Sequence, residues 1–143
     1  MAGRILGLDY GSKTVGVAVT DGLGLTAVSL ETICRDKENH LRSTYRRIQE
    51  LVSEYQAEKI VLGLPLNMDG TEGERARLTR DFGEELGKRT GCTVIYQDER
   101  LTTEEAAEIM RISGTAGKNP KDRIDAVAAA VILTDHLRGS EGN

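Results

Sequence analysis

Two apolar runs near the N-terminus constrain the fold of this chain more than any other feature. Residues 4–9 and 14–20 are rich in apolar and β-branched side chains, which favours strands, and a Tyr-Gly-Ser-Lys segment between them is typical of a tight turn. A third run, residues 26–33, follows a turn that contains Gly22 and Gly24. The sequence therefore predicts a three-stranded meander whose first strand ends at Asp9.

The apolar spacing changes after this meander. Apolar residues then recur every three or four positions, which predicts an amphipathic helix over residues 41–55. The continuously apolar segment 59–64 is typical of a strand buried on both faces, and Pro65 ends it. The helix between the two strands is the connection that a parallel pair requires.

Capping signals mark the start of two further helices. Thr71 with Glu74 predicts a capping box at the start of a helix that runs to about residue 89, and a fifth strand follows at residues 92–96. A second box, Thr102 with Glu105, predicts a short helix to about residue 112.

The last helix is predicted to have Asn119 as its N-cap and Pro120 at its first helical position, and to run to about Leu137. The resulting order, βββαβαβαα, indicates an α/β fold. It has a mixed five-stranded sheet, made of the three-stranded meander plus two helix-linked strands, flanked by helices. We expect residues 1–138 to form a single domain, followed by a polar C-terminal tail at residues 139–143.

Composition narrows the class of protein. With 143 residues, 38% of them hydrophobic, the chain can build one core. It contains no apolar run of 18 residues and no signal-peptide pattern, so we expect a soluble, cytoplasmic protein with no membrane partner. The two cysteines lack metal-binding spacing and are expected to be reduced thiols. A net charge of −4 provides no general attraction to nucleic acid.

Basic residues nevertheless gather in two regions. The first holds Arg35, Lys37, Arg42, Arg46 and Arg47, and the second holds Arg75, Arg77, Arg80, Lys88 and Arg89. Each group is either a solvated helix face or a stripe that faces a substrate, and the sequence alone leaves both interpretations open.

Three acidic residues are predicted to converge. In open α/β sheets, binding sites form beyond the carboxyl ends of the strands. Asp9 ends the first strand and Glu99 follows the fifth, so both lie at one edge if the strand after the first crossover is next to strand one. Asp125 lies on the last helix, where the small side chains of residues 128–130 let the helix lie close to the sheet.

Such a cluster calls for a cation. Two carboxylates about 4 Å apart repel each other by roughly 4 kcal/mol at an effective dielectric constant near 20. Hard oxygen ligands favour Mg²⁺ or Mn²⁺, and two such ions can activate a water and stabilise the leaving oxygen in phosphodiester hydrolysis. The three acids therefore predict a nuclease.

Each acid also has a simpler interpretation. Asp9 is suited to capping the following turn, and Glu99 is suited to a surface ion pair with Arg100. Asp122 and Asp125 are suited to the first turns of a helix, where negative charge complements the macrodipole. Only their convergence distinguishes the metal site from these alternatives.

Four ordered segments resemble the YqgF family, also called RuvX, of Holliday junction resolvase-like proteins with a ribonuclease H-like fold. The segments are Gly7–Lys13 with Val15–Ala18, Gly63–Gly73, Asp98–Thr103 and Lys121–Ala130. The resemblance implies a metal-dependent endonuclease that acts on structured RNA or branched DNA, with a proposed role at the 5′ end of the small-subunit (pre-16S) rRNA precursor. It also implies two ions of Mg²⁺ or Mn²⁺.

The same resemblance assigns roles to individual residues. It implies that Asp9, Glu99 and Asp125 are the catalytic, metal-binding acids, with Asp122 as a further metal ligand. Lys13, Arg100 and Lys121 are candidate phosphate contacts, or else solvated charges. The glycine-rich loop at residues 67–73 is either a second phosphate contact, through backbone N–H groups at a helix start, or a plain connection.

Other functions remain open on the sequence. One alternative is a Holliday junction resolvase, which would act as a homodimer because it cuts two strands. For the other functions the sequence leaves both a monomer and a homodimer open. An actin-like ATPase or phosphotransferase shares the Asp-Gly hairpin, but such enzymes bind nucleotide between two domains and this chain has room for one. A third is a protein that binds nucleic acid without cleaving it. With five aromatic residues, such a protein would recognise backbone and shape rather than stacked bases.

Overall fold

The computed structural model describes residues 3–24, 26–67, 69–98 and 120–141, with the backbone alone at 120–125 and 139–141. The elements in these ranges are β1 (Arg4–Tyr10), β2 (Thr14–Thr20), β3 (Ala27–Cys34), α1 (Arg42–Tyr55), β4 (Ala57–Leu64), α2 (Glu74–Thr90), β5 (Thr93–Asp98) and α4 (Pro120–Glu141). The helix predicted from Thr102 lies outside the described residues.

The strands form one mixed sheet in the order β3-β2-β1-β4-β5. The meander pairs antiparallel, with Asp9 opposite Gly16, whereas β4 runs parallel to both β1 and β5. This confirms the predicted mixed five-stranded sheet, including the expectation that the strand after the first crossover lies beside the first strand. Antiparallel neighbours need only tight turns, while the parallel neighbours are joined through α1 and α2.

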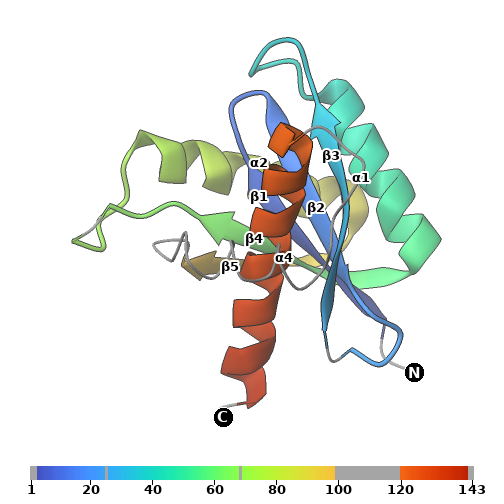
Figure 1. Ribbon diagram of the computed structural model, residues 1–143. Coiled ribbons are helices and arrows are strands. Elements are labelled where there is room, and N and C mark those ends of the chain that lie inside the picture. The colour runs from blue at the N-terminus through green and yellow to red at the C-terminus, as the bar shows by residue number, and fades with distance from the viewer. Residues whose placement is uncertain (1–2, 25, 68, 99–119, 142–143) are drawn as a thin grey trace.

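Helices cover both faces of the sheet (Figure 1). Helices α1 and α2 pack on one face, and the larger core there includes Leu6, Leu8 and Phe82. Helix α4 lies across the other face, where Ala129 and Leu133 are buried in a second, smaller cluster. Alternate residues of each central strand feed the two cores, as the two-residue repeat of a strand requires. None of the described helices is long and apolar enough to cross a membrane.

Two predicted helix ends differ in the structure. The capping box of Thr71 with Glu74 is wrong: α2 begins after Gly73, which makes no side-chain capping hydrogen bond. Thr71 instead bonds through both its N–H (3.0 Å) and its hydroxyl (2.6 Å) to the carboxylate of Asp69, so local turn chemistry takes the side chain away from the helix. Helix α4 continues to Glu141, beyond the expected end at Leu137, since no proline stops it.

Two glycines of α2 give a matched test of this packing. A Cβ on Gly83 would lie 2.5 Å from the Tyr96 hydroxyl and 2.9 Å from a Leu62 methyl, whereas one on Gly87 would meet its neighbours at 3.5 Å or more. We expect Gly83→Ala to lower the free energy of unfolding by about 1–3 kcal/mol through overpacking. Gly87→Ala should raise it by about 1 kcal/mol through helix propensity. Urea unfolding of both variants, monitored by circular dichroism, measures the difference; equal effects would contradict the packing of α2 on β5.

Candidate metal and nucleic-acid site

Asp9 lies at the edge of the sheet where three parallel strands end. Leu8 pairs with Leu62 of β4, and two residues further on Leu64 pairs with Asp98 of β5. Asp9 therefore lies within one residue of the level at which β4 and β5 end. This is the edge at which open α/β sheets form their sites.

The carboxylate belongs to the face of the sheet that α4 covers. Its strand neighbours Leu8 and Tyr10 are buried in the core on the opposite face, and the alternation of the strand assigns Asp9 to the side of Gly7. Asp9 is half-buried. Its antiparallel partner is Gly16, so no side chain from β2 stands beside it in that register.

Helix α4 approaches this face closely because the contact is made by Gly7 on the strand and by an alanine-rich segment on the helix, both of which lack large side chains. A Cβ on Gly7 would lie 2.8 Å from the Leu133 Cβ and 2.9 Å from the carbonyl oxygen of Ala129. Ala129 itself is fully buried. The predicted close approach of this alanine-rich helix is thereby confirmed.

The direction of α4 brings its N-terminal turns toward Asp9. The helix begins at the end of the molecule where the β1–β2 hairpin turns, and it runs toward the opposite end (Figure 1). Asp125 lies one turn before Ala129, and Asp9 lies two residues beyond Gly7, so both are displaced from the Gly7 contact in the same direction. Asp125 is therefore displaced from the Gly7 contact toward the same end of the molecule as Asp9, and the next residue, Ala126, accepts a hydrogen bond from the Ser29 hydroxyl of β3 (3.3 Å).

The structure describes the other predicted site residues unevenly. Glu99 and Arg100 lie outside the described residues. Lys121, Asp122 and Asp125 lie in the first turns of α4, described by their backbone alone. In the part of the chain with described side chains, no three His, Cys, Asp or Glu residues are grouped so that they could hold a metal ion.

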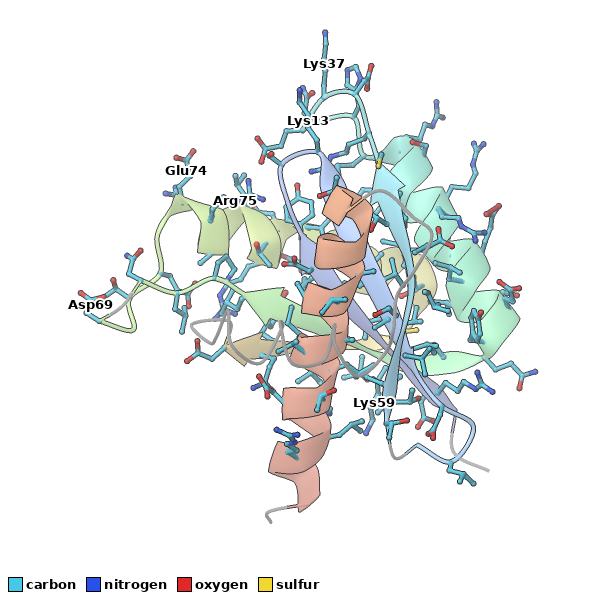
Figure 2. The ribbon with its side chains drawn as sticks, viewed as in Figure 1. Lys13, Lys37, Lys59, Asp69, Glu74 and Arg75 are labelled. Atoms are coloured by element: carbon cyan, nitrogen blue, oxygen red, sulfur yellow. The ribbon has the colours of Figure 1, made fainter. Side chains whose placement is uncertain are left out.

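Lys13 is exposed at the tip of the β1–β2 hairpin. Figure 2 shows it near Lys37, at the end of the molecule where α1 and α2 also begin. Helix N-termini carry partial positive charge, so this end of the molecule combines lysines with dipoles that favour anions.

A buried arginine holds the turn that follows Asp9. Arg35 is only 8% exposed, and it donates from Nε to the carbonyl oxygen of Glu38 (3.0 Å) and from Nη2 to that of Gly11 (2.6 Å). Its backbone N–H also donates to the carbonyl oxygen of Lys13 (2.8 Å). Burial lowers the pKa of Arg35, and the nearby Tyr10 and Glu38 partly oppose that effect. In the structure Arg35 directly follows β3, whereas the predicted strand ends at residue 33, so the sequence pattern contains no clear signal for this role.

The basic groups divide into paired and unpaired residues. In the second group, four members form ion pairs within α2 or with nearby loops, which favours a solvated helix face; these pairs are Arg75–Glu38, Arg80–Glu72, Lys88–Glu84 and Arg89–Glu85. In the first group, Arg47 pairs with Glu31 (2.7 Å) and Glu50 (3.1 Å). Arg42 and Arg46 are exposed and have no ion pair among the described residues.

The glycine-rich loop before α2 folds on itself. Leu66 and Glu72 form an antiparallel bridge, and the N–H groups of Asn67 and Gly70 donate to carbonyl oxygens within the loop. Gly70 has a φ of 88°, which favours glycine. These two loop N–H groups are therefore already bonded, so a phosphate contact would have to use the N–H groups at the start of α2.

Comparison with known proteins identifies the family. A sequence profile described as "RuvX: Holliday junction resolvase" matches residues 3–139. A protein from Agathobacter rectalis named "Putative pre-16S rRNA nuclease" is 51% identical over 134 residues, 94% of each chain. A protein of the same name from Lactococcus lactis is 48% identical over 137 residues, covering 96% of this chain and 95% of its own.

The fold has a solved counterpart. The structure of Thermus thermophilus RuvC superposes with a TM-score of 0.65 at 18% identity, covering 97% of this chain and 96% of that one. This likeness confirms the RuvC-like, ribonuclease H-like fold. With a profile match over nearly its whole length and relatives at 51% and 48% identity, the chain belongs to the RuvX family.

Proposed function

We propose that this chain is a metal-dependent endonuclease that hydrolyses phosphodiester bonds in structured nucleic acid. One observation carries the proposal: Asp9 lies at the shared carboxyl edge of β1, β4 and β5, on the face of the sheet that α4 covers. Family membership and the names of the relatives support the same reaction class.

We assign catalysis to Asp9, Glu99 and Asp125, with Asp122 as a further ligand. These donors are all carboxylates, and hard oxygen ligands suit Mg²⁺ or Mn²⁺. One or two such ions, when bound, would supply a Lewis acid and an activated water. The three acids would hold the ions and fix their positions relative to the phosphodiester.

The alternation of β5 disfavours Asp98 as the partner of Asp9. Val94 and Tyr96 pack against the core beneath α1 and α2, whereas Ile95 packs against the cluster beneath α4. Asp98 follows Val94 and Tyr96 in this repeat and so belongs to the face opposite Asp9.

The aromatic residues favour recognition of backbone and shape. Tyr10, Phe82 and Tyr45 are buried and stacked, with ring centroids 4.2 Å and 5.3 Å apart along the series. The other two rings, Tyr55 and Tyr96, lie under the guanidinium groups of arginines. Since all five rings have such contacts, stacking of unpaired bases is disfavoured.

The proposed substrate is the 5′ end of the pre-16S rRNA precursor, in keeping with the names of the relatives at 51% and 48% identity. Lys13, Arg100 and Lys121 are the proposed phosphate contacts. The family description favours a second candidate, branched DNA cut by a homodimer, because two symmetric cuts need two active sites.

A single side-by-side assay tests reaction and substrate together. We expect the purified chain to cleave a pre-16S 5′ fragment in Mg²⁺ or Mn²⁺ and to lose that activity in EDTA, with a four-way DNA junction cleaved more slowly. Faster cleavage of the junction, together with a dimeric mass from light scattering, would favour the resolvase. Retained binding with no metal-dependent cleavage of either substrate would refute the nuclease.

A further inference from the structure

A basic pocket of about 630 Å³ lies at the start of α1, apart from the acidic edge. The loop after β3 and the first two turns of α1 form its walls. Its charged and reactive lining residues are Cys34, Arg35, Asp36, His40, Arg42 and Arg46. Three of these are arginines, so the pocket combines a concave shape with positive charge.

The helix start that lines this pocket carries the wrong charges for an isolated helix. Leu41 makes no side-chain capping bond, and the first turn of α1 contains no acidic residue. Arg42 instead occupies the first position, where the macrodipole disfavours a cation. Arg42 and Arg46 also stand one turn apart, a spacing at which like charges repel. A bound anion would offset both effects.

The surroundings of Arg35 are a second, independent indication of an anion site. This side chain is more than nine-tenths buried in the pocket wall, and its Nη1 has no hydrogen-bond acceptor among the described residues. The nearby carboxylate of Glu38 is bonded to Arg75. The acid in the lining, Asp36, bonds to His40 at 3.0 Å, and this bond lowers the pKa of that carboxyl. The guanidinium also lies over the Tyr10 ring, with Cζ 5.0 Å from the ring centroid, and Nη1 is its one nitrogen that makes no hydrogen bond among the described residues.

We propose that this pocket binds a phosphate group, and that the phosphate belongs to the backbone of the nucleic-acid substrate at a distance from the cleaved bond. The assignment of this phosphate to a nucleic-acid backbone rests on the proposed nuclease function. Arg35 connects the two regions, since it bonds to the carbonyl oxygen of Gly11, two residues after Asp9. Phosphate backbones are recognised by arginines and by helix N-termini, which are the groups assembled here.

Binding measured in EDTA separates the pocket from catalysis. We expect Arg42→Ala/Arg46→Ala to weaken binding of an RNA duplex about tenfold and to reduce the slope of log K against log salt by about 1 to 2. The control Lys88→Ala/Arg138→Ala removes the same charge from the last turns of α2 and α4. An equal loss in both double variants would overturn a specific site.

Cys34 reports directly on occupancy. It is exposed and lines the pocket, whereas Cys92 is half-buried and bonds to the carbonyl of Ala57 at the opposite edge of the sheet. Mass spectrometry should show RNA duplex slowing iodoacetamide labelling of Cys34 several-fold, with Cys92 unchanged, and Arg42→Ala/Arg46→Ala should remove the protection.

The outcomes of the labelling experiment are distinct. Protection by inorganic phosphate but not by duplex would overturn the nucleic-acid source, and protection by neither would overturn the pocket itself. If the duplex protects Cys34 but the protein cleaves no substrate, the nuclease proposal fails while the pocket proposal stands. If the protein cleaves RNA but no ligand protects Cys34, the nuclease proposal stands and the pocket proposal fails.

Discussion

Asp9→Asn is expected to reduce metal-dependent cleavage by more than about 100-fold, since even the partners that orient metal ligands are worth 10–100-fold. The substitution keeps the shape of the side chain and removes its charge. Asp9 occupies the half-buried carboxyl edge of the central strand, so the local fold should be retained. Single-turnover cleavage in saturating Mg²⁺ or Mn²⁺ gives the rate.

Thermal stability provides a second readout for this variant. If the acids form a metal site, Mg²⁺ or Mn²⁺ should raise the melting temperature of the parent, and Asp9→Asn should remove that increase. Asp81→Asn, at an exposed position of α2, is the matched control and should retain both cleavage and the metal effect. Cleavage by Asp9→Asn within a few-fold of the parent would exclude Asp9 from the chemistry.

Local patterns predicted the elements of this fold well. The predicted strand 14–20 has the observed bounds, and the third strand is shifted by a single residue. Apolar spacing and turn chemistry are properties of neighbouring residues, so a sequence displays them directly. The cap of α2 failed because Thr71 had a competing acceptor two residues earlier, a choice that depends on the shape of the loop.

The candidate site was less accessible to sequence reasoning. The sequence places Arg35 in a basic group that is either a solvated helix face or a stripe facing a substrate. Its acceptor Gly11 lies 24 residues away, and only the paired strands bring the two together. The proposed convergence of Asp9 with Asp125 likewise depends on the direction of α4 across the sheet. Small residues on the helix indicated a close approach, yet the contact with Gly7 is a tertiary feature.

Gly7→Ala is expected to lower both stability and activity, because it separates α4 from the strand that carries Asp9. The added Cβ would lie 2.8 Å from the Leu133 Cβ and 2.9 Å from a main-chain oxygen, neither of which a change of rotamer can move. The helix itself must shift. Overpacking of this kind costs about 1–3 kcal/mol in the free energy of unfolding, measured by urea denaturation.

The activity of Gly7→Ala then tests whether α4 positions a catalytic group. At a temperature where the variant is fully folded, a shift of about 1 Å between Asp9 and Asp125 should still lower kcat, by up to about 100-fold. The control Gly22→Ala adds a methyl in the β2–β3 turn, where the nearest atom is the end of the Arg4 side chain at 3.6 Å, and should change neither quantity. Full activity in a destabilised Gly7→Ala protein would show that α4 serves the core and not the reaction, because the helix would have moved without consequence for catalysis.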